Sequence, residues 1–195
     1  MKTSAFSRLA LPPAAACALL LAAGGALAAQ DSPALGGQTV SRVLNAASNQ
    51  AAVEPDASWS AANPKNFSGK VLTKAAFSQP APARSYGAYV HFAPGARTYW
   101  HMHPLGQTLV VVSGTGLTQA LEANGKPAPV AVVRAGDVVL CPPGVTHWHG
   151  AAPGSAMVHL AVSERDPANP VVWKEAVDEK AYRAGAERAM KGAPK

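Results

Sequence analysis

Short apolar runs separated by glycine, proline and asparagine dominate the chain from about residue 67 onward. The runs 85–92 and 138–141 are rich in β-branched, aromatic or aliphatic residues and stand between turn residues. Runs of this length and composition are typical of β-strands. The pattern predicts further strands at residues 70–74, 99–103, 108–112, 117–122, 130–134, 145–149 and 156–163. Strands spaced this closely predict an all-β sandwich or barrel.

The C-terminal part of the chain changes to a helical pattern. Residues 173–191 are rich in alanine, and charges of both signs alternate along them. Val177, Ala181 and Ala184 recur roughly at the spacing of one helix face. We therefore expect a short helix, packed through this stripe, in a tail that spans residues 171–195.

The first 28 residues are organised like a cleavable secretory signal. Lys2 and Arg8 precede an apolar run of alanine and leucine, which ends in small residues at Ala28. A membrane anchor is the alternative, but the run is short for a span and no stop-transfer pattern follows it. Cys17 lies inside the run rather than at its end, which argues against a lipoprotein. We expect the mature protein in the periplasm or outside the cell, and not in the membrane.

The residues between this signal and the first strands show little periodicity. Residues 29–66 are rich in small and polar residues, with a short helical pattern at 39–47, and predict a flexible extension. The barrel is expected over residues 67–170. One domain with extensions fits a chain of 195 residues.

Composition and charge narrow the class of partner. The chain is 48% hydrophobic and 14% charged, which suits a globular core with a lightly charged surface. Its net charge of +6 falls to +4 when the two basic residues of the signal are removed. The other basic residues are dispersed, which predicts a solvated surface rather than a nucleic-acid footprint. We expect a small-molecule substrate and no nucleic acid.

The histidines indicate where the chemistry occurs, because all six lie between residues 91 and 159. His101 and His103 are two residues apart in a predicted strand and therefore share a face. Gln107 follows the next turn, and His147 and His149 follow a Pro-Pro-Gly turn. One such pair alone would suit buried, hydrogen-bonded histidines, but two clusters favour a metal site. Three imidazoles and an amide oxygen suit zinc, manganese, iron, nickel or cobalt.

The spacing of these residues resembles the two sequence motifs of the cupin superfamily. The first motif, G(x)5HxH(x)3E(x)6G, is matched with glutamine in place of glutamate by Gly95, His101, His103, Gln107 and Gly114. The second motif, G(x)5PxG(x)2H(x)3N, is matched with alanine in place of asparagine by Gly136, Pro142, Gly144, His147 and Ala151. The resemblance implies a single-domain cupin jelly-roll, or double-stranded β-helix, with a short C-terminal helix.

Within the cupins, three segments closely resemble the small bacterial (R)-selective hydroxynitrile lyases, also called mandelonitrile lyases. The segments are PGARTYWHMHPLGQTL, HWHGAAP and MVHLAVSE, and the resemblance spans about residues 55–183. It implies one divalent metal, for which we expect manganese, held by His101, His103, Gln107 and His147. Those lyases also use glutamine as a ligand. The resemblance implies a homodimer as well.

The same resemblance implies a proton carrier and a pocket. His159 matches a histidine that lines the cavity of those lyases and acts in catalysis, and an unperturbed histidine titrates near pH 6.5. A core histidine bonded to a backbone carbonyl is the alternative. The implied pocket residues are Ala88, Val90 and Ser163. His149 joins them because it lies two residues after His147 and should face the same way, although it could equally be structural.

The ligand charges suggest a type of reaction. Neutral imidazoles and a neutral amide leave the charge of the ion uncompensated, which makes it a stronger Lewis acid toward an anionic oxygen. This suits the cleavage of a cyanohydrin, in which the hydroxyl loses its proton as cyanide leaves and a carbonyl forms. The alternatives are a dioxygenase or decarboxylase/isomerase, aldol-type or lactone chemistry, and a non-catalytic periplasmic binding protein.

Four further residues receive structural interpretations. Cys141, the single cysteine after signal removal, is expected to be buried rather than a nucleophile, since no base for it is evident. Arg97 is expected in a structural ion pair, with a substrate carboxylate as the alternative. Trp100 and Trp148 alternate with the ligand histidines and should point away from the metal.

Overall fold

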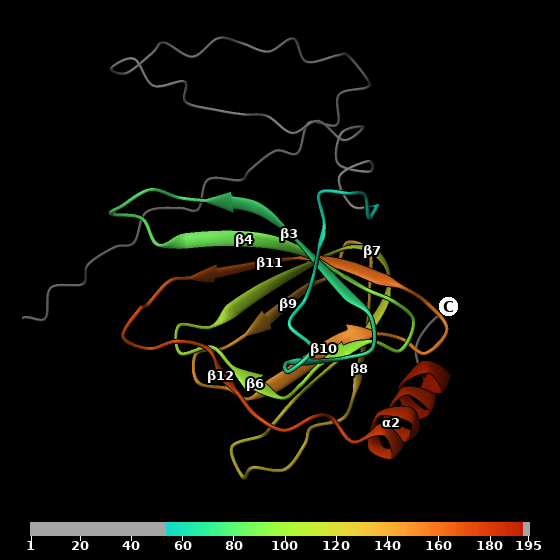
Figure 1. Ribbon diagram of the computed structural model, residues 1–195. Coiled ribbons are helices and arrows are strands. Elements are labelled where there is room, and N and C mark those ends of the chain that lie inside the picture. Colours follow the sequence, from blue (N-terminus) through green and yellow to red (C-terminus); the bar gives the residue numbers. More distant parts are fainter. Residues whose placement is uncertain (1–53, 193–195) are drawn as a thin grey trace, which may run out of the picture. The chain divides into compact units, whose positions relative to one another are not determined.

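The computed structural model describes residues 54–192, in which two antiparallel sheets face each other (Figure 1). The predicted signal peptide and residues 29–53 lie outside the described residues. The first sheet has the order β1 (Ser60–Ala61), β3 (Val71–Ser78), β4 (Ser85–Phe92), β11 (Met157–Glu164), β7 (Gln107–Ala120) and β9 (Val138–Cys141). Its longest strand, β7, continues into the second sheet.

The second sheet is built around β10 (His147–Ala151). In this sheet β7 pairs with β10 and with β8 (Ala131–Arg134). On the other side of β10 lie β5 (Arg97–Thr98) and β6 (His101–Met102), which pair in turn with β2 (Phe67–Ser68) and β12 (Val172–Trp173). Helix α2 (Glu179–Gly192) follows. The prediction of an all-β barrel with a short C-terminal helix is confirmed.

The predicted strand boundaries match the observed ones best where turn residues close to each strand mark its ends. The predicted strands 85–92 and 138–141 coincide with β4 and β9. The predicted strands 108–112 and 117–122 instead form one 14-residue strand, β7. Gly114, which suggested a break, has φ +76, and a Cβ there would lie 1.9 Å from the carbonyl oxygen of Ala156. This glycine lets the strand pass from one sheet to the other.

The sheet also begins earlier than predicted. Strand β1 lies within the predicted extension 29–66 and pairs with β3, placing Ser60 opposite Thr73. Trp59 beside it is 8% exposed and packs on the outer face of the first sheet against Val158. A single large aromatic residue therefore fixes this segment, which has little hydrophobic periodicity.

The predicted helix 173–191 begins too early. Val172 and Trp173 form β12, and the helix begins at Glu179. Asp178 caps it, because its carboxylate accepts the backbone N–H of Ala181 at 2.8 Å. The buried helix face consists of Tyr182, Gly185 and Ala186 rather than the predicted stripe, of which Ala181 is exposed and Val177 is buried just before the helix.

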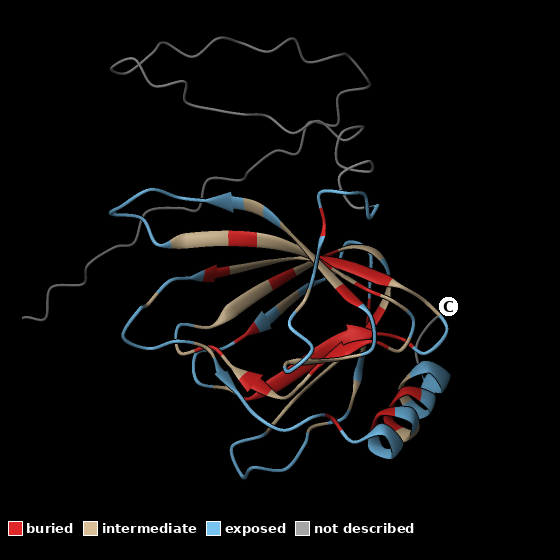
Figure 2. Cartoon of the chain, in the orientation of Figure 1, coloured by how far each residue is buried: buried red, intermediate tan, exposed pale blue. Residues whose placement is uncertain are grey.

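The core has one cluster between the sheets and one under the helix. Phe92, Val111 and Met157 belong to the first cluster. Trp148, which is 0% exposed, belongs to the second with Tyr182, and Trp100 packs against it, as predicted for side chains that point away from the histidines. Figure 2 shows the consequence for β10, which is buried along its whole length.

Arg97 anchors the helix to the second sheet. Its guanidinium is buried, donates to Glu179 Oε2 at 2.7 Å and to the Val177 carbonyl at 3.0 Å, and lies 4.2 Å from the ring centre of Tyr182. This confirms the structural ion pair. Within residues 54–192, the structure contains no helix that could span a membrane.

Candidate metal centre

Two turns and two strands bring the motif histidines together. His101 on β6 stands directly opposite His147 on β10, with ring centroids 4.4 Å apart. Two backbone N–H groups donate to the carbonyl of His103: that of Gly106 in the turn before β7, and that of Gly144 in the Pro-Pro-Gly turn, the latter at 3.0 Å. Both glycines have φ near +75 to +79, which L-residues rarely adopt. The two motifs thus converge on one point.

Local hydrogen bonds determine which ring nitrogen of these histidines is free. Nδ1 of His101 lies 3.0 Å from the Tyr99 carbonyl oxygen, and Nδ1 of His147 lies 3.0 Å from that of Val145. A carbonyl oxygen only accepts, so Nδ1 of each neutral ring carries the proton and donates. Nε2 of each ring therefore presents a lone pair, as in metal-bound histidines.

Gln107 completes this arrangement from β7. Its Oε1 lies 3.3 Å from Nε2 of His147, and it also interacts with His101. If Nε2 is an acceptor, two acceptor atoms face each other at this distance. Lone-pair atoms that bind the same cation lie close together in this way, so these nitrogen and oxygen atoms fit a divalent ion.

The structure also brings in a histidine that the sequence assigned to the pocket. His101, His147 and His149 each offer a ligand atom, and these atoms lie within 4.8 Å of one another, so the three could hold a metal ion. His103 is not in this group. Its ring lies 5.3 Å from that of His101 and 5.9 Å from that of His147, centroid to centroid. It also lines a surface cleft of about 300 Å³.

A second pair of histidines lies deeper in the barrel. Nε2 of His159 is 3.1 Å from Nδ1 of His149, and both rings are buried. The two remaining nitrogens, His149 Nε2 and His159 Nδ1, are buried without a hydrogen-bond partner in the described part of the chain. Such orphaned atoms are rare, and they indicate a site that a ligand or substrate completes.

Burial keeps the cluster uncharged. Desolvation, and after it the neighbouring His147, lower the pKa of His101 to about 3. The same two causes, in the same order, lower the pKa of His103 to about 4, and desolvation lowers that of His159 to about 3. The pKa of His149 lies well below its usual value, first through desolvation and then through His159. Neutral imidazoles are the form that binds metal.

The implied pocket residues share a face with this cluster. Val90 stands opposite His159, Ala88 opposite Ala161, and Ser163 opposite Gln107. Directly opposed residues in an antiparallel ladder project to the same side. The small side chain of Ala88 thus lies one layer from His159 on the inner face of the first sheet.

Cys141 stands opposite Gln107 on β9 and is 7% exposed, as predicted for a buried cysteine. Desolvation raises the pKa of its thiol to about 12. The thiol is therefore protonated at neutral pH and is not an activated nucleophile.

Sequence reasoning missed two neighbours of the histidines. Trp173 stacks on His101, with ring centroids 4.7 Å apart. The hydroxyl of Thr98 accepts the backbone N–H of His149 at 3.1 Å. Residue 173 was assigned to a helix, and its β-branched neighbours Val171 and Val172 were the available signal for a strand. The contact of Thr98 depends on strand pairing and has no local signal.

Comparisons with known proteins find relatives in both sequence and structure. The sequence pattern of the cupin domain matches residues 88–163. The chain is 48% identical over 117 residues to a protein of Granulicella tundricola named (R)-mandelonitrile lyase, covering 60% of this chain and 86% of that one. It also resembles the crystal structure of a cupin-like protein of Thermotoga maritima, with a TM-score of 0.59 and 38% identity over 65% of this chain and 92% of that chain.

Proposed function

The chain belongs to the cupin superfamily, and from this premise we propose that it is a metal-dependent lyase of the hydroxynitrile type. It would cleave cyanohydrins reversibly to an aldehyde and cyanide. The relative named (R)-mandelonitrile lyase supports this proposal. The observation that carries it is the hydrogen-bonded pair of His149 and His159 beside the metal ligands, because cyanohydrin cleavage needs a proton acceptor next to the bound hydroxyl.

The residues that would hold the ion are His101, His103, Gln107 and His147, and manganese is the ion that we propose. A bound divalent ion would supply a Lewis acid toward the substrate hydroxyl. All four ligands are neutral, so none reduces that acidity by compensating charge. His149 belongs to the group of three close histidines and is the residue that could replace His103 in this set.

The protonation of the second pair separates these two roles for His149. If His149 Nδ1 donates to His159 Nε2, then His149 Nε2 has a lone pair and His159 Nδ1 carries a proton. If His159 Nε2 donates instead, His159 Nδ1 is the basic atom and His149 Nε2 carries a proton, which prevents metal binding through Nε2. In the second arrangement His149 orients His159 by accepting its Nε2–H, and Nδ1 of His159 is the base of the lyase.

The proposed step transfers one proton and shifts two electron pairs. The substrate hydroxyl transfers its proton to Nδ1 of His159, and the oxygen lone pair forms the carbonyl as the bond to cyanide breaks. Cyanide leaves with the electrons of that bond and receives the proton back from Nδ1. The hydrogen bond to His149 holds His159 Nε2 throughout. The small side chains of Ala88 and Val90 leave space for the organic group of the aldehyde.

Cyanide release from racemic mandelonitrile tests this function. The manganese-loaded protein should release cyanide, and both the metal-stripped protein and His159→Ala should lose most of the rate. His91→Ala is the matched control, because His91 stands opposite Val158 on the outer face of the same sheet. Absence of release by protein with stoichiometric metal would refute the lyase. Oxygen uptake with small acids would then be measured.

Two further proposals concern the context of the enzyme. We propose that residues 1–28 direct it to the periplasm or medium, which fractionation and N-terminal sequencing of the mature chain would test. We also propose a homodimer, which light scattering of the purified protein would test.

A further inference from the structure

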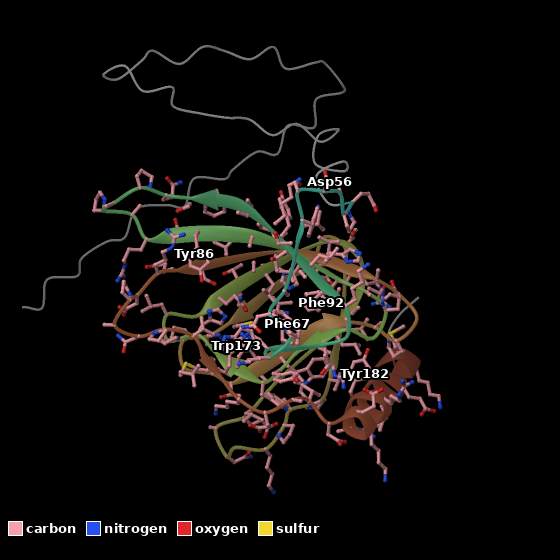
Figure 3. All side chains as sticks on the ribbon, viewed as in Figure 1. Asp56, Phe67, Tyr86, Phe92, Trp173 and Tyr182 are labelled. Atoms are coloured by element: carbon pink, nitrogen blue, oxygen red, sulfur yellow. The ribbon has the colours of Figure 1, made fainter. Side chains whose placement is uncertain are left out.

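Trp173 lies against a metal ligand from a distant part of the chain. It is in β12, outside the residues matched by the cupin pattern, and stands directly opposite His101 on β6. The two rings are stacked, 4.7 Å apart between centroids and inclined by 25°. Figure 3 shows Trp173 beside Phe67, whose ring is 5.6 Å away.

Several bonds fix the backbone around Trp173. The Lys174 N–H donates to the Trp100 carbonyl at 2.8 Å, and the Trp100 N–H donates to the Glu175 carbonyl at 3.0 Å. The indole N–H donates to the side-chain oxygen of Asn66 at 3.3 Å, with the amide oriented to accept it. We call residues 172–175 the strap. It is tied to the chain after Trp173 by these backbone bonds and before Trp173 by the pairing of Val172 with Met102.

The strap shields His101 from solvent. Trp173 is 36% exposed, whereas His101 beneath it is 1% exposed. The indole of Trp173 therefore has one face toward solvent and the other against His101. That second face covers an imidazole of the metal centre.

The stack supplies a constraint that the hydrogen bond of His101 lacks. The bond from Nδ1 to the Tyr99 carbonyl fixes one atom of the ring, but the ring can still tilt about that contact. A flat indole 4.7 Å away prevents the tilt and keeps Nε2 directed at the ion. The imidazole also becomes electron-poor when it coordinates a cation, and an indole face attracts such a ring more strongly than a neutral one.

We propose that Trp173 is a positioning residue of the metal centre, which holds His101 by stacking and so strengthens metal binding. The inference rests on the metal site of the proposed function. By reciprocity, a bound ion stabilises the docking of the strap by the same factor. The residue acts through His101 and does not contact the substrate.

The experiment compares two substitutions that keep an apolar side chain over His101. Trp173→Phe retains an aromatic face, and Trp173→Leu does not. The affinity of the full-length protein for Co²⁺ is measured by competition with a chelator, and the visible spectrum of the Co²⁺ form reports ligand geometry. Val172→Ala is the matched control, since Val172 is in the same strand but stands opposite Met102.

We expect Trp173→Leu to weaken Co²⁺ binding about tenfold and to change the spectrum, while Trp173→Phe stays within about threefold. Co²⁺ should also slow hydrogen exchange at the Lys174 amide in the wild type, and less so in Trp173→Leu. Equal affinities of the Leu and Phe variants, or equal losses in Val172→Ala and Trp173→Leu, would overturn the proposal. Wild-type protein that binds no Co²⁺ would overturn the metal site as well.

Discussion

Two pairs of buried histidines lie inside the barrel, and they bond their ring nitrogens in different ways. His101 and His147 each contact the carbonyl oxygen two residues earlier through Nδ1. His149 and His159 contact each other, and each retains one nitrogen without a partner among residues 54–192. The first pair has its protons fixed by acceptors that cannot change. The second pair can hold its shared proton in either of two arrangements.

The difference separates two tasks that one residue type performs. A metal ligand needs a fixed tautomer, because a proton on the coordinating nitrogen blocks the ion. A proton carrier needs a hydrogen bond at one ring nitrogen that persists while the other ring nitrogen gains and loses a proton. We therefore propose that the first pair binds the metal and that the second pair transfers the proton.

Replacement of His147 should have the largest effect. His147→Ala removes a ligand from the first pair, so the dissociation constant for Mn²⁺ should rise more than about 100-fold, since even outer-shell losses cost 10–100-fold. Cyanide release should fall with metal occupancy. Chelator competition and a cyanide assay measure the two effects, with His91→Ala as the control. Retention of Mn²⁺ affinity would remove His147 from the ligand set.

Replacement of His149 sharpens the division between the pairs. If His149 orients His159 rather than binding the metal, His149→Ala should leave Mn²⁺ affinity within about threefold and reduce cyanide release by about 100-fold, the lower end of the range of general acid–base effects. The same two assays apply. A loss of Mn²⁺ affinity as large as that of His147→Ala would place His149 among the ligands and would contradict the assignment of the second pair.

The sequence predicted the first pair better than the second. The bonds of His101 and His147 reach only two residues along the chain, and the spacing of the histidines about their turns already implied that they meet. The His149–His159 bond depends on the packing of β10 against β11 across the barrel, which no local pattern encodes. His149 was accordingly placed in the pocket without a defined partner.

The fold shows the same division between local and distant signals. Strand β9, bounded by Gly136 and Pro142, was predicted to the residue. The continuation of β7 through Gly114 was not, because the glycine is required by the close approach of Ala156, the residue just before β11. The strap was mistaken for a helix, because its alanine-rich, charged surroundings suit a helix locally while its pairing with β6 is 70 residues distant in the chain.

Acid should destabilise the folded state of the metal-free protein through a buried histidine of each pair. The pKa of both His101 and His159 is lowered to about 3, chiefly by desolvation, so below pH 6.5 the unfolded chain binds protons that the folded chain does not. The free energy of unfolding should therefore decrease as the pH falls from about 6.5 toward about 3, by about 1.4 kcal/mol per pH unit for each such histidine.

Urea unfolding of the metal-free protein at several pH values between 7 and 5 measures this slope. His159→Leu removes one of the buried imidazoles, so its slope should be flatter than that of the wild type by the contribution of one group. An unchanged slope would mean that His159 does not remain neutral in the folded protein at these pH values.

The smallest predicted effect concerns the backbone of the second pair. Thr98 accepts the N–H of His149 at 3.1 Å in a buried setting, so Thr98→Val leaves this donor unsatisfied and should cost about 1–3 kcal/mol of unfolding free energy.

Thr118→Val is the matched control, because the Thr118 hydroxyl donates to the Trp148 carbonyl from the strand on the other side of β10. Both variants should lose stability in urea unfolding, but only Thr98→Val should slow cyanide release, by up to about tenfold, through displacement of His149. Mn²⁺ affinity should be unchanged in both, because His101 and His147 keep their own carbonyl partners. Equal cyanide release by the two variants would show that the position of His149 does not limit proton transfer.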